Sequence, residues 1–176
     1  MNLEPARGRT IPDVLGPGLR VLFCGINPSL QSGLTGHHYA RPGNRFWAAL
    51  HRSGFTDRQL RPEEDATLLR YGLGCTNLVA RATARADEVP AEELRAGAVR
   101  LRELAGGWRP QWVAIVGIGA ARLALRLPPT SVGRQECGLG SASLWVLPST
   151  SGLNAHHQLA DLADAFAALR QAVLRG

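Results

Sequence analysis

The sequence predicts an α/β fold, a three-layer α/β/α sandwich around a central, mostly parallel four-stranded sheet. Short apolar runs typical of buried strands alternate along the chain with longer segments typical of helices. A length of 176 residues suits one domain, and 45% hydrophobic with only 19% charged residues excludes a disordered chain. We therefore expect a single domain spanning 1–176.

Four strands follow from the apolar runs, at 20–26, 74–79, 112–117 and 144–147. Five helices are predicted between and after them, at 45–53, 63–70, 92–105, 120–127 and 158–174. Asn44 and Pro90 stand where helix starts are favoured, and Gly54 and Gly106 stand where helices end. Residues 1–19 are expected to form an irregular lead-in, because their prolines interrupt any long regular element.

The positive charge is carried by one residue type. All 20 basic residues are arginine, and 14 acidic residues leave a net charge of +6. Residues 1–56 carry 6 Arg against 2 acids and residues 104–176 carry 6 against 3, whereas residues 57–103 carry 8 against 9. Basic ends favour a polyanionic partner, and nucleic acid is favoured over a membrane because no basic amphipathic helix is present.

The absence of lysine excludes two kinds of chemistry. A Schiff base needs an amine that can lose its proton, and a guanidinium stays charged. The phosphate-binding P-loop also requires a lysine. Arginine is instead suited to forked contacts with phosphate.

The cysteine pattern indicates a reduced, cytoplasmic protein, because Cys24, Cys75 and Cys137 are odd in number and widely spaced. No apolar run has membrane length or the form of a signal peptide. The adjacent pairs His37-His38 and His156-His157 are poorly placed to converge on one ion. We expect no metal, no cofactor and no membrane partner.

Three loops are the places to search for a site, because the cleft of a parallel sheet lies beyond the carboxyl ends of its strands. These loops span 27–44, 80–89 and 148–157. A competing nucleotide site is conceivable at Gly117-Ile-Gly119, but Arg122 stands at the third small position and no acidic partner follows at the expected spacing. Tight packing of strand against helix is the favoured interpretation there.

Three sequence blocks, each at the end of a predicted strand, carry a resemblance over nearly the whole chain. They are 25–29 with 35–47, then 76–83, then 147–154. Together they resemble the mismatch-specific uracil and thymine DNA glycosylases of the uracil-DNA glycosylase superfamily. The resemblance implies a monomeric, monofunctional enzyme of base excision repair that acts on double-stranded DNA. It would flip uracil, and by extension thymine or modified pyrimidines, out of a mismatch with guanine and hydrolyse the N-glycosidic bond to leave an abasic site.

Base flipping needs an aromatic surface, polar groups for the base edge and a wedge for the vacated space. The resemblance makes Tyr39 the stacking aromatic, and it places Ile26, Ser32 and Asn77 in the base pocket. A carboxamide such as that of Asn77 can pair with both a carbonyl and an N–H. Each of these residues also has a structural interpretation, as core or loop packing.

Asn27 matches the residue that holds the attacking water. An amide can orient water but cannot take its proton at neutral pH. Ser149 stands where the faster uracil-specific branches of the superfamily have a histidine. A second catalytic group besides Asn27 would therefore have to come from another residue. Asp87 is the candidate, because its carboxylate could activate water or stabilise the sugar cation. The alternative is that Asp87 only favours the helix start near Pro90.

Leu153 is the predicted wedge, since an exposed apolar side chain at a loop tip can unstack a base step. Gly152 and Asn154 would offer backbone groups to the widowed guanine. The main alternative to an enzyme is a non-catalytic module that binds DNA damage or mismatches, because Asn27 and Ser149 are both weak catalytic groups.

Overall fold

A five-stranded sheet forms the centre of the computed structural model, which describes residues 2–129 and 132–176. The strands are β1 (Val21–Gly25), β2 (Leu73–Asn77), β3 (Trp112–Val116), β4 (Gly133–Leu139) and β5 (Ala142–Leu147), in the spatial order β2-β1-β3-β5-β4. All pairs are parallel except β4 with β5. The mostly parallel sheet is as predicted.

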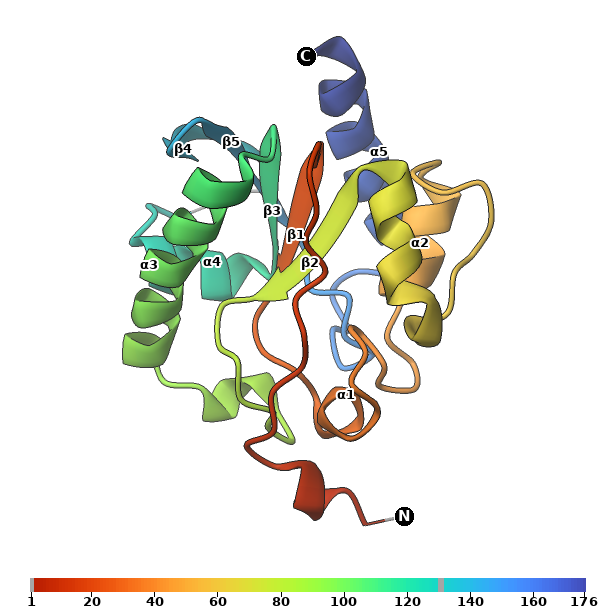
Figure 1. The fold of residues 1–176 in the computed structure, drawn as a ribbon, viewed down its shortest axis with the longest axis vertical. Coiled ribbons are helices and arrows are strands. Elements are labelled where there is room, and N and C mark those ends of the chain that lie inside the picture. Colours follow the sequence, from red (N-terminus) through yellow and green to blue (C-terminus); the bar gives the residue numbers. More distant parts are fainter. Residues whose placement is uncertain (1, 130–131) are drawn as a thin grey trace.

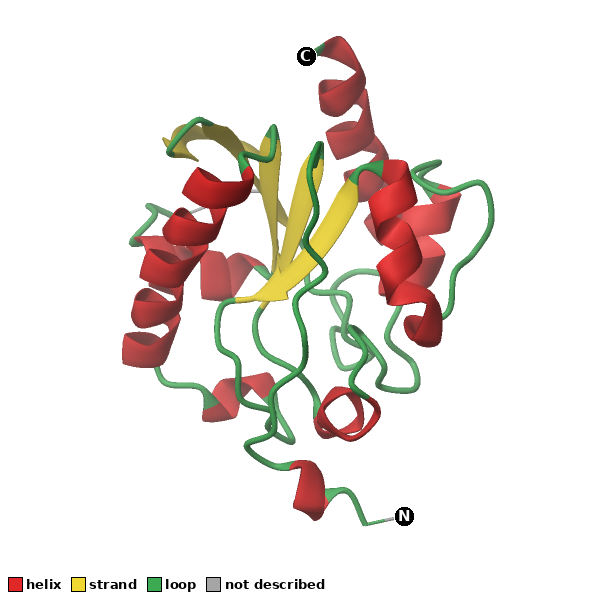
Figure 2. Cartoon of the chain, in the orientation of Figure 1, coloured by secondary structure: helices red, strands yellow, loops and turns green. Residues whose placement is uncertain are grey.

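Helices cover both faces of this sheet (Figures 1 and 2). The α-helices are α1 (Leu30–Thr35), α2 (Phe46–Arg52), α3 (Ala91–Trp108), α4 (Ile118–Leu125) and α5 (Leu159–Arg175), and 3₁₀ turns span Glu4–Ala6, Pro62–Tyr71 and Ala86–Glu88. α3 and α4 lie on one side of the sheet, and α2, α5 and the 3₁₀ segment Pro62–Tyr71 lie on the other. The three-layer prediction is confirmed.

Two apolar cores follow from the alternation of side chains along the strands. In β1, Phe23 points to the layer with α2 and α5, where its ring centroid lies 5.4 Å from that of Phe46 and 5.7 Å from that of Phe166. Its neighbours Leu22 and Cys24 point to the opposite layer, against α3 and α4. All residues of β1 are buried, which explains the continuously apolar run.

The strand that the sequence did not predict is β4, which makes the sheet five-stranded instead of four-stranded. Its seven residues, Gly-Arg-Gln-Glu-Cys-Gly-Leu, are mostly exposed or half-buried. β4 is an edge strand joined to β5 by a tight turn in which Gly140 has a φ of 62°. An edge strand buries little, so no apolar run marks it.

Three predicted elements differ in detail. The loop after β1 contains the short helix α1, and the predicted helix 63–70 is a 3₁₀ segment with non-helical backbone at Glu64. α3 continues through Gly106 to Trp108 and ends where Arg109 adopts a left-handed conformation with a φ of 51°. Glycine lowers helix stability without forbidding a helix, so Gly106 did not end it.

The lead-in is fixed to the loop that follows β2. The backbone amide of Gly8 donates to the Ala82 carbonyl, and the amide of Ala82 donates to the Arg9 carbonyl. Val14 exchanges two backbone hydrogen bonds with Cys75 of β2. The lead-in therefore adds a wall at the edge where the parallel strands end.

No helix in the described ranges 2–129 and 132–176 is both long enough and apolar enough to cross a bilayer.

Candidate functional site

A pocket of about 110 Å³ opens at the carboxyl ends of the parallel strands. Six predicted site residues line it: Ile26, Asn27, Ser32, Tyr39, Asn77 and Ser149. They come from the segments after β1 and β5 and from the last residue of β2, and the lead-in adds Ile11. The volume is well below the roughly 300–1,000 Å³ of pockets for drug-sized ligands, which suits a single small ring.

The carboxamide of Asn27 has a defined orientation. Its Nδ2 donates to the Arg81 carbonyl at 3.0 Å and to Oγ1 of Thr83 at 2.8 Å. The Thr83 hydroxyl donates its own hydrogen to the Arg85 carbonyl at 2.7 Å, so Oγ1 acts as an acceptor toward Asn27. If the amide were flipped, Oδ1 of Asn27 would face the Arg81 carbonyl oxygen, and neither atom could donate. Both N–H groups are thus used, and Oδ1 of Asn27 remains to accept a hydrogen bond in the pocket.

Tyr39 presents an aromatic ring backed by a second ring. It stacks on Phe46 with ring centroids 3.8 Å apart and planes 11° from parallel. Its φ of 53° lies in the left-handed region, which is uncommon for a non-glycine residue and characteristic of functional sites. Its buried hydroxyl has no hydrogen-bond partner among the described residues, and burial raises the pKa of Tyr39 well above the usual tyrosine value.

Gly25 lets the polar ends of the Asn77 and Tyr39 side chains approach the backbone. A Cβ on Gly25 would lie 2.5 Å from Oδ1 of Asn77 and 3.3 Å from the hydroxyl of Tyr39. Gly25 and Asn77 are register partners of β1 and β2, so the Asn77 side chain stands directly over the end of β1. Only glycine leaves room there for both polar groups.

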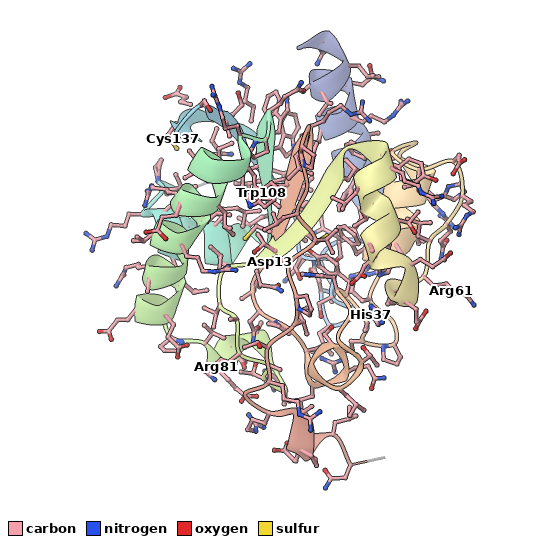
Figure 3. The ribbon with its side chains drawn as sticks, viewed as in Figure 1. Asp13, His37, Arg61, Arg81, Trp108 and Cys137 are labelled. Atoms are coloured by element: carbon pink, nitrogen blue, oxygen red, sulfur yellow. The ribbon has the colours of Figure 1, made fainter. Side chains whose placement is uncertain are left out.

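A network behind the pocket fixes the end of β2. Arg100 of α3 donates to the Asn77 carbonyl at 3.2 Å and forms an ion pair with Asp13. Asp13 also accepts from the hydroxyl of Thr76 at 2.7 Å. Asp13 lies near the end of β2, with Arg81 on the loop beyond it (Figure 3). The backbone of Asn77 is therefore held by a charge-assisted contact.

The two serines have local partners. The Ser32 hydroxyl, which is buried, accepts from the amide of Ala40 at 3.2 Å and from the hydroxyl of Ser29 at 3.2 Å. It thereby ties α1 to the residue after Tyr39. The Ser149 hydroxyl accepts from the amide of Ser151 at 3.3 Å.

His38 also lines the pocket. From the sequence it was considered only together with His37, as a pair poorly placed to bind a metal ion. Its Nε2 lies 2.9 Å from the Pro12 carbonyl, which can only accept, so Nε2 carries the hydrogen. Burial lowers the pKa of His38 and favours the neutral imidazole. Its position directly before Tyr39 was the available signal.

Arg41 lies at the rim of the pocket and also lines an adjoining groove with Leu3, Leu30 and Pro42. It is exposed and forms no ion pair within the described part of the chain. Its guanidinium is therefore free to meet a phosphate.

The loop after β5 projects Leu153, whose surface is 64% exposed. Gly152 packs closely on the Gly43 backbone, because a Cβ there would lie 2.9 Å from the Gly43 carbonyl oxygen.

The polar groups of Asn154 form hydrogen bonds within the chain. Its amide donates to the Ser151 carbonyl, its carbonyl accepts from Arg45, and its Nδ2 donates to the Ser149 carbonyl. Asn154 thus stabilises the loop instead of presenting free groups.

Asp87 is not brought to the pocket. Its carboxylate is 65% exposed and pairs with the Arg85 guanidinium at 2.6 Å. The residues that line the pocket within the described ranges include neither Asp nor Glu. A catalytic role for Asp87 remains a prediction that would require the 3₁₀ turn Ala86–Glu88 to move.

The described residues contain no group of three or more His, Cys, Asp or Glu side chains that could hold a metal ion.

Comparison with known proteins shows which family the chain belongs to. The model of the family described as the uracil DNA glycosylase superfamily matches residues 12–173. The chain belongs to the uracil DNA glycosylase superfamily. Membership in the uracil DNA glycosylase superfamily supports DNA glycosylase activity, which is the hydrolysis of an N-glycosyl bond in DNA.

A solved structure shares the superfamily fold. It is the solution NMR structure of a candidate uracil DNA glycosylase from Methanosarcina acetivorans, with a TM-score of 0.61 and 22% sequence identity. The match covers 93% of this chain and 98% of that one. The likeness at this level of identity concerns the fold.

Proposed function

We propose that this superfamily member excises uracil mispaired with guanine from double-stranded DNA and leaves an abasic site, as in the mismatch-specific branch. The observation that carries the proposal is the carboxamide of Asn27, which lines the pocket. Its Nδ2 donates to Arg81 and Thr83, and its Oδ1 has no hydrogen-bond partner among the described residues. Uracil, with thymine or modified pyrimidines as further substrates, would stack on Tyr39. The Asn77 carboxamide would read its edge.

The reaction needs only water as co-substrate. The water oxygen forms a bond to C1′ of the deoxyribose while the bond from C1′ to the base nitrogen breaks. The bonding electron pair leaves with the base, which takes up one proton, and the attacking water releases one proton, so that OH is added to C1′ and H to the base. Oδ1 of Asn27 accepts a hydrogen bond from the water and aims its lone pair at C1′. No carboxylate lines the described pocket, so orientation of the water is the main contribution of the protein here.

Strand cleavage is not part of the proposed reaction. Cleavage by β-elimination usually proceeds through a Schiff base on the sugar, which needs an amine. The chain has no lysine, so the N-terminal amine is the remaining candidate. We expect the product to be an intact strand with an abasic site.

The decisive experiment incubates the protein with duplex oligonucleotides that carry one G·U, G·T or A·U pair and with the matching single strand. Breaks at uracil that appear only after alkaline treatment support a monofunctional glycosylase. Breaks without alkali would contradict the absence of lyase activity. Intact strands under both conditions would overturn the proposed function.

A non-catalytic mismatch-binding module is the second candidate, favoured by the lack of Asp and Glu among the described pocket residues. Retention of G·U duplex in a mobility-shift assay without any alkali-sensitive site would support this module over the enzyme.

Replacing Leu153 with alanine is expected to weaken excision from G·U duplex by about 10- to 100-fold. The exposed side chain would fill the space left by the flipped base, and alanine is too short to do so. Single-turnover rates on duplex DNA measure the effect. A change to alanine at Leu174, a comparably exposed leucine at 56% on α5, is the matched control and should leave the rate unchanged. Equal rates for Leu153→Ala and wild type would remove Leu153 from the mechanism.

A further inference from the structure

Arg45 connects two segments that are distant in sequence. It directly precedes α2, and its guanidinium reaches the loop after β5. Nη1 donates to the His157 carbonyl at 2.5 Å, and Nη2 donates to the carbonyls of Ser151 at 2.6 Å and Asn154 at 3.0 Å. The backbone amide of Arg45 also donates to the Thr150 carbonyl at 2.9 Å. One residue thus binds the start, middle and end of the loop.

The contacts of Arg45 are unusual for an arginine of this chain. Many of the other arginines that have partners pair with acids, such as Arg81 with Glu93 and Arg58 with Glu64. Arg45 makes no ion pair in the described ranges, and its charge faces three backbone carbonyls. Its side chain is half-buried, and its buried Nε has no hydrogen-bond partner among the residues that the structure describes. Such a half-buried arginine has the loop as its main polar environment.

The tethered carbonyls lie on both sides of Leu153. Ser151 is two residues before it and Asn154 is one residue after it. Because both carbonyls turn inward to the guanidinium, the intervening Gly152-Leu153 segment is left at the outside of the loop. Gly152 packs on the Gly43 backbone, which limits movement of the loop toward Gly43. The loop itself has no helix or strand hydrogen bonds to hold this shape.

We propose that Arg45 is a positioning residue that holds the loop 149–157 so that Leu153 can enter the DNA stack. This inference rests on the proposed function, and it adds a determinant of duplex specificity. A wedge is needed only where a base stack must be opened. Loss of Arg45 should therefore reduce excision from duplex DNA much more than excision of uracil from a single strand or from the loop of a DNA hairpin.

The first test needs no DNA. Arg45→Met keeps a long side chain and removes every side-chain donor, while the backbone amide that donates to the Thr150 carbonyl remains. We expect faster amide hydrogen exchange at residues 151–157 in this variant, and unchanged exchange in the strands of the sheet. Arg45→Lys, which retains the charge but not the fork, should show an intermediate increase. Unchanged exchange at 151–157 in Arg45→Met would overturn the tether whatever the protein does to DNA.

The second test measures single-turnover excision. Arg45→Met should lose on the order of 10- to 100-fold on G·U duplex and less than about threefold on a hairpin-loop uracil. Arg52→Met is the matched control, because Arg52 is exposed at the other end of α2 and has no ion pair or side-chain hydrogen bond in the described chain. It removes the same charge and should stay near wild type on both substrates. Equal losses on the two substrates for Arg45→Met would contradict the positioning role.

A double-mutant cycle with Leu153→Ala completes the test. If Arg45 acts through Leu153, adding Arg45→Met to Leu153→Ala should cost little further duplex activity, whereas independent effects would multiply. If the wild-type protein excises no base at all, the proposed function fails, and the hydrogen-exchange result still decides the tether. If the wild-type protein excises uracil and the losses of duplex activity from Arg45→Met and Leu153→Ala multiply, the positioning role is contradicted while the proposed function stands.

Discussion

Replacing Asn27 with alanine is expected to lower single-turnover excision of uracil by about 100- to 10,000-fold, with affinity for G·U duplex within about threefold of wild type. The change removes the only amide oxygen that the network of Arg81 and Thr83 leaves free at this point of the pocket. It removes no cationic group and does not alter Leu153, so DNA binding should persist. Quenched-flow excision and fluorescence anisotropy measure the two quantities.

Thr83 offers a matched pair of variants for the same argument. Thr83→Val keeps the shape of this buried side chain but removes Oγ1, so Nδ2 of Asn27 retains only the Arg81 carbonyl as acceptor. The amide can then rotate, and we expect an intermediate loss of rate. Thr83→Ser keeps the hydroxyl and should stay close to wild type. A normal rate in Asn27→Ala would show that water is oriented by another group.

Replacing Gly97 with alanine is expected to destabilise the fold by about 1–3 kcal/mol, even though alanine is the better helix former. Gly97 lies in α3, and a Cβ there would stand 2.1 Å from the Leu78 carbonyl oxygen and 2.7 Å from the Leu78 carbonyl carbon. These are backbone atoms that cannot rotate away, so α3 must shift from the sheet. Urea unfolding followed by circular dichroism measures the change.

Gly106→Ala in the same helix is the control, because no atom lies within 4 Å of its added Cβ. Helix propensity alone predicts a gain of about 0.5–1 kcal/mol there. The two substitutions are chemically identical, but their expected effects on the free energy of unfolding are opposite in sign. Equal stabilisation by both would mean that α3 does not pack against Leu78 as closely as described. Because Leu78 follows Asn77, we also expect slower excision in Gly97→Ala.

The sequence predicted the elements that bury apolar side chains. β1 and β3 are continuously apolar because both faces of the sheet are covered, and this pattern is visible in one dimension. β4 could not be found in this way, because its residues are largely solvent-accessible and pairing with β5 alone defines it. The end of α3 was predicted too early, at Gly106, because glycine lowers the stability of a helix without ending it.

The site was predictable to the extent that its residues lie directly after strands. Asn27, Asn77 and Ser149 each follow or end a strand, and strand ends meet at one edge of a parallel sheet. Arg45 left no comparable pattern, since its partners lie more than 100 residues away along the chain. Asp87 was predicted at the site because it lies in the loop after β2, but its carboxylate pairs with Arg85 in the structure.

The fixed lead-in has a practical consequence for handling the protein. The N-terminus lies beside the loops at the carboxyl ends of the strands, whereas the C-terminus ends α5 at the opposite end of the molecule (Figure 1). Ile11 in the lead-in is itself part of the pocket wall. Affinity tags, fluorophores and surface-immobilisation linkers therefore belong on the C-terminal side, where they leave the approach of a DNA duplex unobstructed.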